Sequence, residues 1–242
     1  MQSNLLNIAI EAVRVAGKII CQAFDQTDIV DAKVAEHVVF RLEQIITKSF
    51  PKHNVAALGK FTDNDGDCTW FIEPVDGVYN ANRGYQQFAT TIAIKIQDAV
   101  THSIIFNPLT HDLYTAGAGN GARLNDRRIR ITKTNKLQNA CFALEPNSTS
   151  NEFDKIINKT LSVTNNIRII GCPALALAHT TAGQNDAFIG FDIPANTLMA
   201  AELLIRESGG FFGGLEPEDT LPNKYIIASN RALYPAVCNL LK

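Results

Sequence analysis

The run Glu73-Pro74-Val75-Asp76-Gly77 places two carboxylates three residues apart, where a β-type segment meets a proline and a glycine. A carboxylate at a strand end and a second one in the following turn can converge on one cation such as Mg²⁺. If a helix begins near Gly77, its free backbone amides could also face a phosphate group. The same pattern is common in ordinary turns that bind nothing. The run alone leaves a metal-phosphate site and a structural turn both open.

The segments around this run predict a sheet preceded by two helices. WFIEPVDG, FATTIAIKI, AVTHSIIF, DLYTAGAG and RLNDRRIRIT are rich in β-branched and aromatic residues and are separated by turn formers. Upstream, apolar residues recur at steps of three and four, which predicts an amphipathic helix after Ser3, its expected N-cap. A second helix is expected from about Ala35 to Ser49, and the polar stretch TDNDGDC that follows it is typical of a surface loop.

Beyond about Asn139 the chain alternates between strand and helix patterns. The expected strands are Arg168–Ile170, Ala187–Ile189 and Tyr225–Ala228, and the expected helices are Glu152–Leu161, Ala174–Thr181, Leu198–Ser208 and Ala232–Leu241. Internal repeats and long linkers are absent from the sequence. We therefore expect a single domain over residues 1–242, made of an N-terminal α+β half (1–138) and a C-terminal α/β half (139–242).

The residues around Asp76 resemble the signature of a known family. Trp70–Gly77 is similar to the W-[IV]-[IV]-D-P-[IL]-D-G-T signature of the inositol monophosphatase family. Further landmarks of its bacterial SuhB-type members follow in order: Leu6–Ala9, Ala16-Gly17, Ser49–His53, Phe88–Ala93, Gly119–Asn125, Gly171–Leu175 and Glu207–Gly210. This resemblance covers nearly the whole chain. It implies an α/β fold, a layered αβαβα sandwich of the inositol monophosphatase or sugar phosphatase type.

The resemblance also implies a chemistry, in which carboxylates hold Mg²⁺ ions that bind a phosphate and activate a water molecule. The metal-binding positions that keep an oxygen ligand are Glu73, the Val75 carbonyl and Asp76, and we expect Mg²⁺ to bind there weakly or not at all. The resemblance places substrate contacts at Gly77, Val78, Cys172 and Ala174.

Three positions of the resemblance carry residues that cannot do the family's chemistry. Leu58 and Thr197 stand where a metal-binding glutamate and aspartate are expected. Val78 replaces a hydroxyl residue that partners the nucleophilic water, and its side chain can neither donate nor accept a hydrogen bond. The glutamate that contacts the inositol ring corresponds to Gly190, or to Asp192 after a small shift. No residue is therefore assigned a catalytic role.

We accordingly expect a family homologue that is catalytically impaired or inactive and is retained as a regulatory or binding protein. Two alternatives stay open. One is a Mg²⁺-dependent phosphomonoesterase that hydrolyses inositol monophosphate or a related sugar phosphate, and the other is a phosphate or polyol binding module. The resemblance also implies a homodimer and a protein partner in the transcription machinery.

Composition narrows the partners and the compartment. Lys and Arg number 22 against 24 Asp and Glu, a net charge of −2, so we expect no nucleic-acid partner and no membrane association. Five cysteines without a C-x-x-C pair indicate a reducing compartment, and we expect the cytoplasm. One basic cluster remains as a solvated face or as a contact for a partner or RNA: Arg123, Arg127, Arg128, Arg130 and Lys133.

Overall fold

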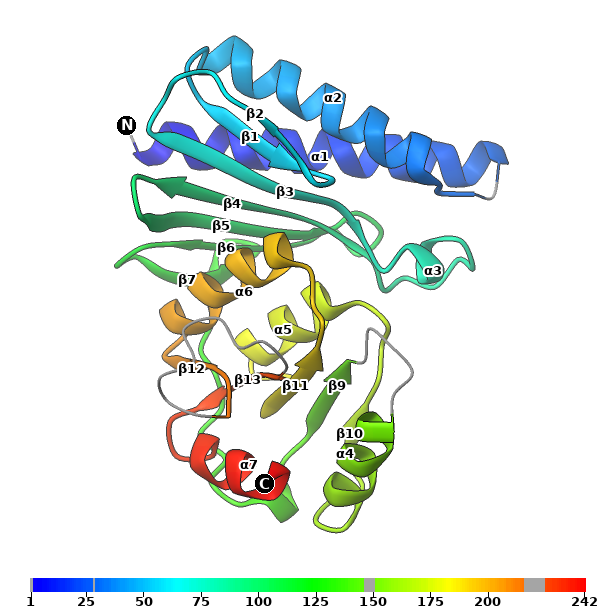
Figure 1. Cartoon of the computed structure of the whole chain (residues 1–242), viewed down its shortest axis with the longest axis vertical. Helices are drawn as coiled ribbons and strands as arrows, with labels where there is room; N and C mark the ends of the chain where they lie inside the picture. The colour runs from blue at the N-terminus through cyan, green and yellow to red at the C-terminus, as the bar shows by residue number, and fades with distance from the viewer. Residues whose placement is uncertain (1, 28, 146–150, 216–224) are drawn as a thin grey trace.

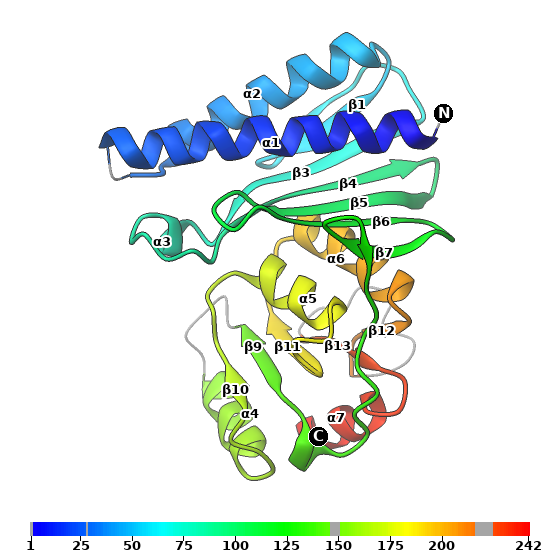
Figure 2. The ribbon, with the colours of Figure 1, turned by 180° about the vertical axis from the view of Figure 1, so that it is seen from behind.

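Helices and sheets alternate in five layers in the computed structural model, which describes residues 2–27, 29–145, 151–215 and 225–242 (Figure 1). Helices α1 (Gln2–Thr27) and α2 (Ala32–Ser49) cover one face of an eight-stranded sheet. Helices α5 (Pro173–Thr181) and α6 (Ala195–Glu207) lie between this sheet and a five-stranded sheet. Helices α4 (Asn151–Leu161) and α7 (Tyr234–Leu241) lie beyond the second sheet, as the view from behind also shows (Figure 2). The predicted αβαβα sandwich is confirmed.

The eight-stranded sheet has the order β2-β1-β3-β4-β5-β6-β7-β8. Its strands are β1 (Asn54–Ala57), β2 (Lys60–Thr62), β3 (Cys68–Asp76), β4 (Ala89–Ile96), β5 (Ala99–Asn107), β6 (Asp112–Gly117), β7 (Gly121–Leu124) and β8 (Arg127–Arg128). Strands β1 and β3 pair in parallel, whereas the other neighbours are antiparallel.

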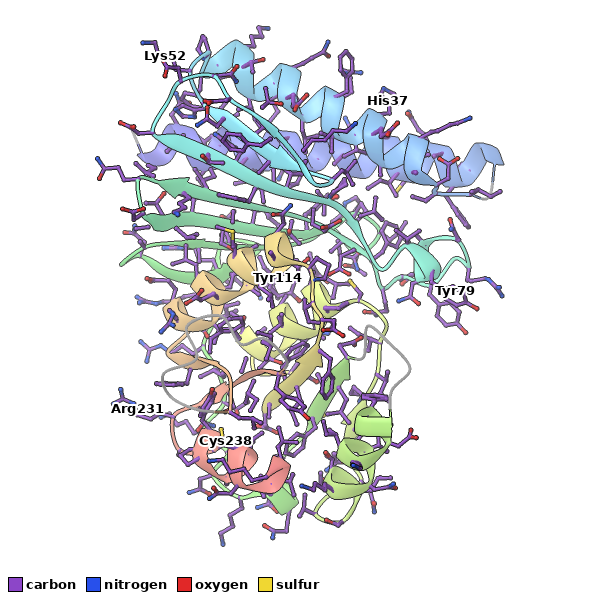
Figure 3. All side chains as sticks on the ribbon, viewed as in Figure 1. His37, Lys52, Tyr79, Tyr114, Arg231 and Cys238 are labelled. Atoms are coloured by element: carbon purple, nitrogen blue, oxygen red, sulfur yellow. The ribbon has the colours of Figure 1, made fainter. Side chains whose placement is uncertain are left out.

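Alternation along β3 decides which face each side chain joins. Trp70 and Ile72 belong to the core that α1 and α2 cover, whereas Phe71 packs against the core of α5 and α6. Glu73 lies two residues after Phe71 and is therefore on the same face of the sheet, so its side chain points toward the C-terminal half. Tyr114 of β6, which is labelled in Figure 3, belongs to this inner core. The centroid of its ring lies 6.4 Å from that of His179 on α5.

The five-stranded sheet has the order β10-β9-β11-β13-β12. Its strands are β9 (Phe142–Glu145), β10 (Ile167–Arg168), β11 (Ala187–Phe191), β12 (Gly210–Gly213) and β13 (Tyr225–Asn230). The 3₁₀ helix η1 (Leu137–Asn139) comes just before β9, the first strand of this sheet. Every strand of the first sheet precedes residue 138, and every strand of the second follows residue 139. No helix in the described part of the chain is long and apolar enough to cross a membrane.

Several element boundaries differ from the sequence-based expectations. Helix α1 begins at Gln2, so Ser3 lies inside its first turn and is not the N-cap. Helix α2 begins at Ala32, because the Asp31 side chain accepts a hydrogen bond from the Val34 amide and caps it earlier than the apolar pattern indicated.

The largest differences concern short strands. The hairpin β1–β2, together with β9 and β12, was not predicted, since three- and four-residue strands give too little periodicity. The segment 123–132 was predicted as one strand, but it turns at Asn125 and Asp126, both with positive φ. It forms the end of β7 and the whole of β8. The turn at 117–121 was expected and joins β6 to β7.

Candidate functional site

The end of β3 carries the acidic run and departs from regular pairing with β4. The register shifts between Glu73 and Asp76, and the Thr90 hydroxyl donates a 2.8 Å hydrogen bond to the Pro74 carbonyl. Gly77 follows with φ +83, and a Cβ there would lie 2.7 Å from the Gln87 carbonyl oxygen. Only glycine fits this turn, which turns the chain from β3 into the four-residue helix α3 (Val78–Ala81).

The Asp76 carboxylate is buried between the two halves of the molecule and already has protein partners. Its Oδ2 atom accepts a 2.7 Å hydrogen bond from the Ala174 amide, in the first turn of α5, and a longer one of 3.5 Å from the Thr197 hydroxyl on α6. The Cys172 thiol donates to the Asp76 carbonyl at 3.5 Å. Asp76 therefore joins β3 to α5 and α6.

Burial raises the pKa of Asp76 to about 6, although hydrogen bonds from Ala174, Thr197 and Gly77 oppose the shift. Burial, followed by the nearby charge of Asp76, raises the pKa of Glu73 to about 7. Among the described residues, none forms a hydrogen bond or ion pair with the Glu73 side chain. Glu73 pairs in register with Thr91 of β4, whose hydroxyl is buried and equally lacks a described partner. Glu73 is therefore partly protonated near pH 7.

Glu145, at the end of β9, is an acid that the sequence analysis missed. Its carboxylate accepts hydrogen bonds from the Ile170 amide at 2.9 Å and the Gly171 amide at 3.1 Å. Burial raises its pKa to about 7, with Asp76 adding to the shift. The available signal was a second Glu-Pro dipeptide after an apolar run, since Glu145-Pro146 follows FAL as Glu73-Pro74 follows WFI.

Three of the other predicted site residues lie next to Asp76. Cys172, Ala174 and Thr197 contact Asp76, and the Cys172 Cβ lies 3.0 Å from where a Gly77 Cβ would be. Val75 is buried at the register shift, whereas Val78 is exposed at the start of α3.

Leu58 and Gly190 occupy two more of these positions. The parallel register pairs Ala57 of β1 with Ile72 of β3. Leu58 follows Ala57 and Glu73 follows Ile72, so these two residues are adjacent across the strands. Leu58 is exposed and has φ +52 at the tip of the β1–β2 hairpin. Gly190 has no room for a side chain, because a Cβ there would lie 2.6 Å from the Phe188 ring. Asp192 is exposed after the end of β11. Position 190 therefore cannot supply the glutamate that would contact the inositol ring.

The oxygen atoms of this site do not form a cation site. Within the described ranges, no three His, Cys, Asp or Glu side chains gather in a way that could hold a metal ion. Mg²⁺ requires near-octahedral oxygen ligands, but the best-placed oxygen, Asp76 Oδ2, already accepts from an amide and a hydroxyl. The residues present do not fit the metal centre that the resemblance implies.

Comparison with known proteins decides the family. The sequence model of the inositol monophosphatase family matches residues 1–242. The chain belongs to this family. It is 29% identical over 259 aligned positions to the Nus factor SuhB of Pseudomonas aeruginosa, covering 98% of this chain and 96% of the relative. It is 30% identical to the Nus factor SuhB of Escherichia coli K12, covering 87% of this chain and 86% of the relative.

A solved structure supports the same family fold. The crystal structure of extragenic suppressor protein suhB from Bartonella henselae superposes with a TM-score of 0.89 and 25% sequence identity, covering 99% of this chain and 98% of that one. The layered α/β architecture is therefore that of the SuhB-like inositol monophosphatases. That Leu58, Val78 and Thr197 replace acidic and hydroxyl residues of the metal site stays a prediction from the sequence resemblance.

Proposed function

We propose that this chain is a family member without phosphatase activity that acts as a regulatory or binding protein. The observation that carries this proposal is the state of Asp76, whose carboxylate has become a hydrogen-bond acceptor for the first turn of α5. A metal ion at Oδ2 would have to compete with the Ala174 amide and the Thr197 hydroxyl. Phosphate monoesters are among the slowest substrates to hydrolyse unaided, so a site with so few free oxygens cannot lower the barrier enough.

The water-activating position supports the same proposal. Val78 follows Gly77 at the start of α3, and its side chain offers no atom that could orient or deprotonate a water molecule. Leu58 and Thr197 likewise provide no carboxylate. The raised pKa of Glu73, about 7, leaves this last free acid partly neutral at physiological pH, which weakens it further as a cation ligand.

A phosphatase assay separates this proposal from the alternative of a Mg²⁺-dependent phosphomonoesterase. Inositol monophosphate and related sugar phosphates are incubated with the protein, with Mg²⁺ or Mn²⁺, and phosphate release is measured. We expect no release above the level of the Asp76→Asn variant. Metal-dependent release that disappears in Asp76→Asn would establish the alternative and overturn the proposal.

Restoring the lost acids tests the reason for inactivity. The combined variant Leu58→Glu, Glu73→Asp and Thr197→Asp returns a carboxylate to positions 58 and 197. It also shortens the acid at position 73 to the aspartate that the family resemblance expects. We expect Mg²⁺ to raise the thermal unfolding midpoint of this variant but not that of the natural chain, because only a ligand that binds the folded state stabilises it. If the variant folds and still does not respond to Mg²⁺, the assignment of these three positions is wrong.

The binding role is assigned from the relatives. The P. aeruginosa and E. coli relatives carry the name Nus factor, and we propose that this chain also works with the transcription machinery, as a homodimer. Its five free cysteines fit the cytoplasm, where that machinery is found. Size-exclusion chromatography with light scattering tests both statements: we expect twice the chain mass of 26.5 kDa, and a larger complex with purified transcription elongation factors. A monomer that forms no such complex would refute this role while leaving the phosphatase result untouched.

A further inference from the structure

An open pocket of about 630 Å³ lies between α1 and the turns at one end of the first sheet. Helix α1 contributes Arg14, Gly17, Lys18 and Cys21 to its wall. The opposite wall comes from the ends of β5 and β6 and from the β7–β8 turn. A volume of several hundred Å³ is the size of sites that hold small organic molecules.

The floor of this pocket is apolar. Phe106 and Leu113 are cross-strand partners of β5 and β6, and both pack in the core on the face that α1 covers. Glu73, Asp76 and Glu145 together are called the acidic site below. Glu73 points from the other face of the same sheet, so the pocket and the acidic site lie on opposite faces. Gly17 allows α1 to approach closely, since a Cβ there would lie only 2.6 Å from the Cβ of Pro108. The helix and the turn thus form a tightly packed floor.

Two cations border this floor, and neither has a partner among the residues that the structure describes. Arg14 and Lys18 are exposed, four residues apart and therefore on one face of α1, and both line the pocket. Neither forms an ion pair within 4.0 Å or a side-chain hydrogen bond with any described residue. Among the residues that line the pocket, the other ionisable groups are Cys21, His111 and Asp126, so the one carboxylate of the lining stands on the wall opposite Arg14 and Lys18.

The far wall is held in shape by its own hydrogen bonds. The Asn125 side chain accepts from the Leu113 amide at 2.9 Å and donates to the Asp112 carboxylate at 3.4 Å. The Asp126 carbonyl accepts a 3.0 Å hydrogen bond from Arg123. A ligand would therefore enter a preformed pocket and would not have to order these turns, which favours binding.

We propose that this pocket binds a small organic anion with an apolar body. The carboxylate or phosphate group contacts Arg14 and Lys18, and the body covers Phe106, Pro108 and Leu113. Unpaired cations beside an apolar floor select for a ligand that carries both features, because each interaction alone is weak at an open site. The proposal concerns the α1 face only and does not depend on what happens at Asp76.

Isothermal titration without added metal tests this with four probes. 1-Naphthoate and 1-naphthylphosphonate carry the apolar body with either anionic group, 1-naphthalenemethanol lacks the charge, and inorganic phosphate lacks the body. We expect at least one naphthyl anion to bind about tenfold more tightly than both controls, a difference of about 1.4 kcal/mol. The better of the two anions identifies the head group. Equal binding of all four probes, or of none, would overturn the proposal.

Charge-reversal variants place the binding in the pocket. Arg14→Glu combined with Lys18→Glu should weaken the naphthyl anion by about tenfold or more, since two charge-assisted contacts become repulsive. The matched control is Lys33→Glu combined with Lys48→Glu, which makes the same change of net charge on exposed positions of α2. Equal weakening in both variants would mean that the anion responds to overall charge, and the pocket would be excluded.

Two cysteines give a site-specific readout on the unmodified protein. Cys21 lines the pocket, whereas Cys141 lies near β9, and both are partly buried free thiols whose pKa burial raises. The bound naphthyl anion should slow alkylation of Cys21 by iodoacetamide, measured by peptide mapping, and leave Cys141 unchanged. A probe that binds without protecting Cys21, or that protects both thiols equally, occupies another place and contradicts the proposal.

Discussion

The acidic site and the α1 pocket lie on opposite faces of one sheet, and their charged groups are partnered in opposite ways. At the acidic site, Asp76 and Glu145 accept hydrogen bonds from backbone amides at the start of α5 or just before it. In the pocket, Arg14 and Lys18 have no described partner and stand beside apolar side chains.

This difference separates a structural use of charge from a recognition use. A buried carboxylate must be paired or neutralised, and here amides and protonation meet that need, which ties the two halves together. An exposed cation needs no internal partner and remains free to meet a ligand. The family resemblance predicted the first region from Glu73 and Asp76. The second region is indicated by Arg14 and Lys18, whose side chains have no described hydrogen-bond or ion-pair partner.

The largest effect is expected when Asp76 is removed. Asp76→Ala leaves the buried Ala174 amide without an acceptor, so we expect the free energy of unfolding to fall by about 2–4 kcal/mol in urea denaturation. Asp76→Asn keeps an oxygen that can accept from this amide and should lose less than half as much. Adding Mg²⁺ should not change the stability of the natural chain. A natural chain stabilised by Mg²⁺, with both variants equally unstable, would show that Asp76 serves as a metal ligand after all.

A smaller effect is expected from pH. The pKa values of Glu73 and Glu145 are raised to about 7, and that of Asp76 to about 6, above the values of unfolded chains. The folded state therefore holds protons that the unfolded state releases, and the free energy of unfolding should fall as pH rises from 5 to 8.

Glu145→Gln isolates one of these carboxyl groups. We expect the loss of stability between pH 5 and 8 to become smaller by about 2 kcal/mol in this variant, because one proton release is removed. Glu36→Gln, at an exposed position of α2, controls for the loss of one formal charge. If both variants show the same pH profile as the natural chain, Glu145 does not hold its proton in the folded state.

The sequence predicted the fold and much of the acidic site, but for different reasons. Long amphipathic helices and the Trp70–Gly77 run are local patterns, and they located α1, α2 and β3. Glu145 was missed because its role depends on amides of residues 170 and 171, which only the folded chain brings near. The pocket was missed for a similar reason, since Gly17 and Pro108 meet only when α1 packs on the sheet.

The smallest effect concerns that contact. A glycine in a helix interior makes the helix less stable than an alanine does, by about 1 kcal/mol, so Gly17→Ala would stabilise an isolated helix. Here the new Cβ would lie 2.6 Å from the Pro108 Cβ and 3.0 Å from the Phe106 ring. We expect a net loss of about 1 kcal/mol in urea denaturation, together with weaker probe binding, because α1 must move off the pocket floor. The double variant Gly17→Ala with Pro108→Gly removes the Cβ atom of the closer clash and should be more stable than Pro108→Gly alone. If Gly17→Ala by itself stabilises the protein, the pocket floor is looser than the contacts of Gly17 indicate, and the pocket is not the preformed site in which Arg14 and Lys18 await a ligand.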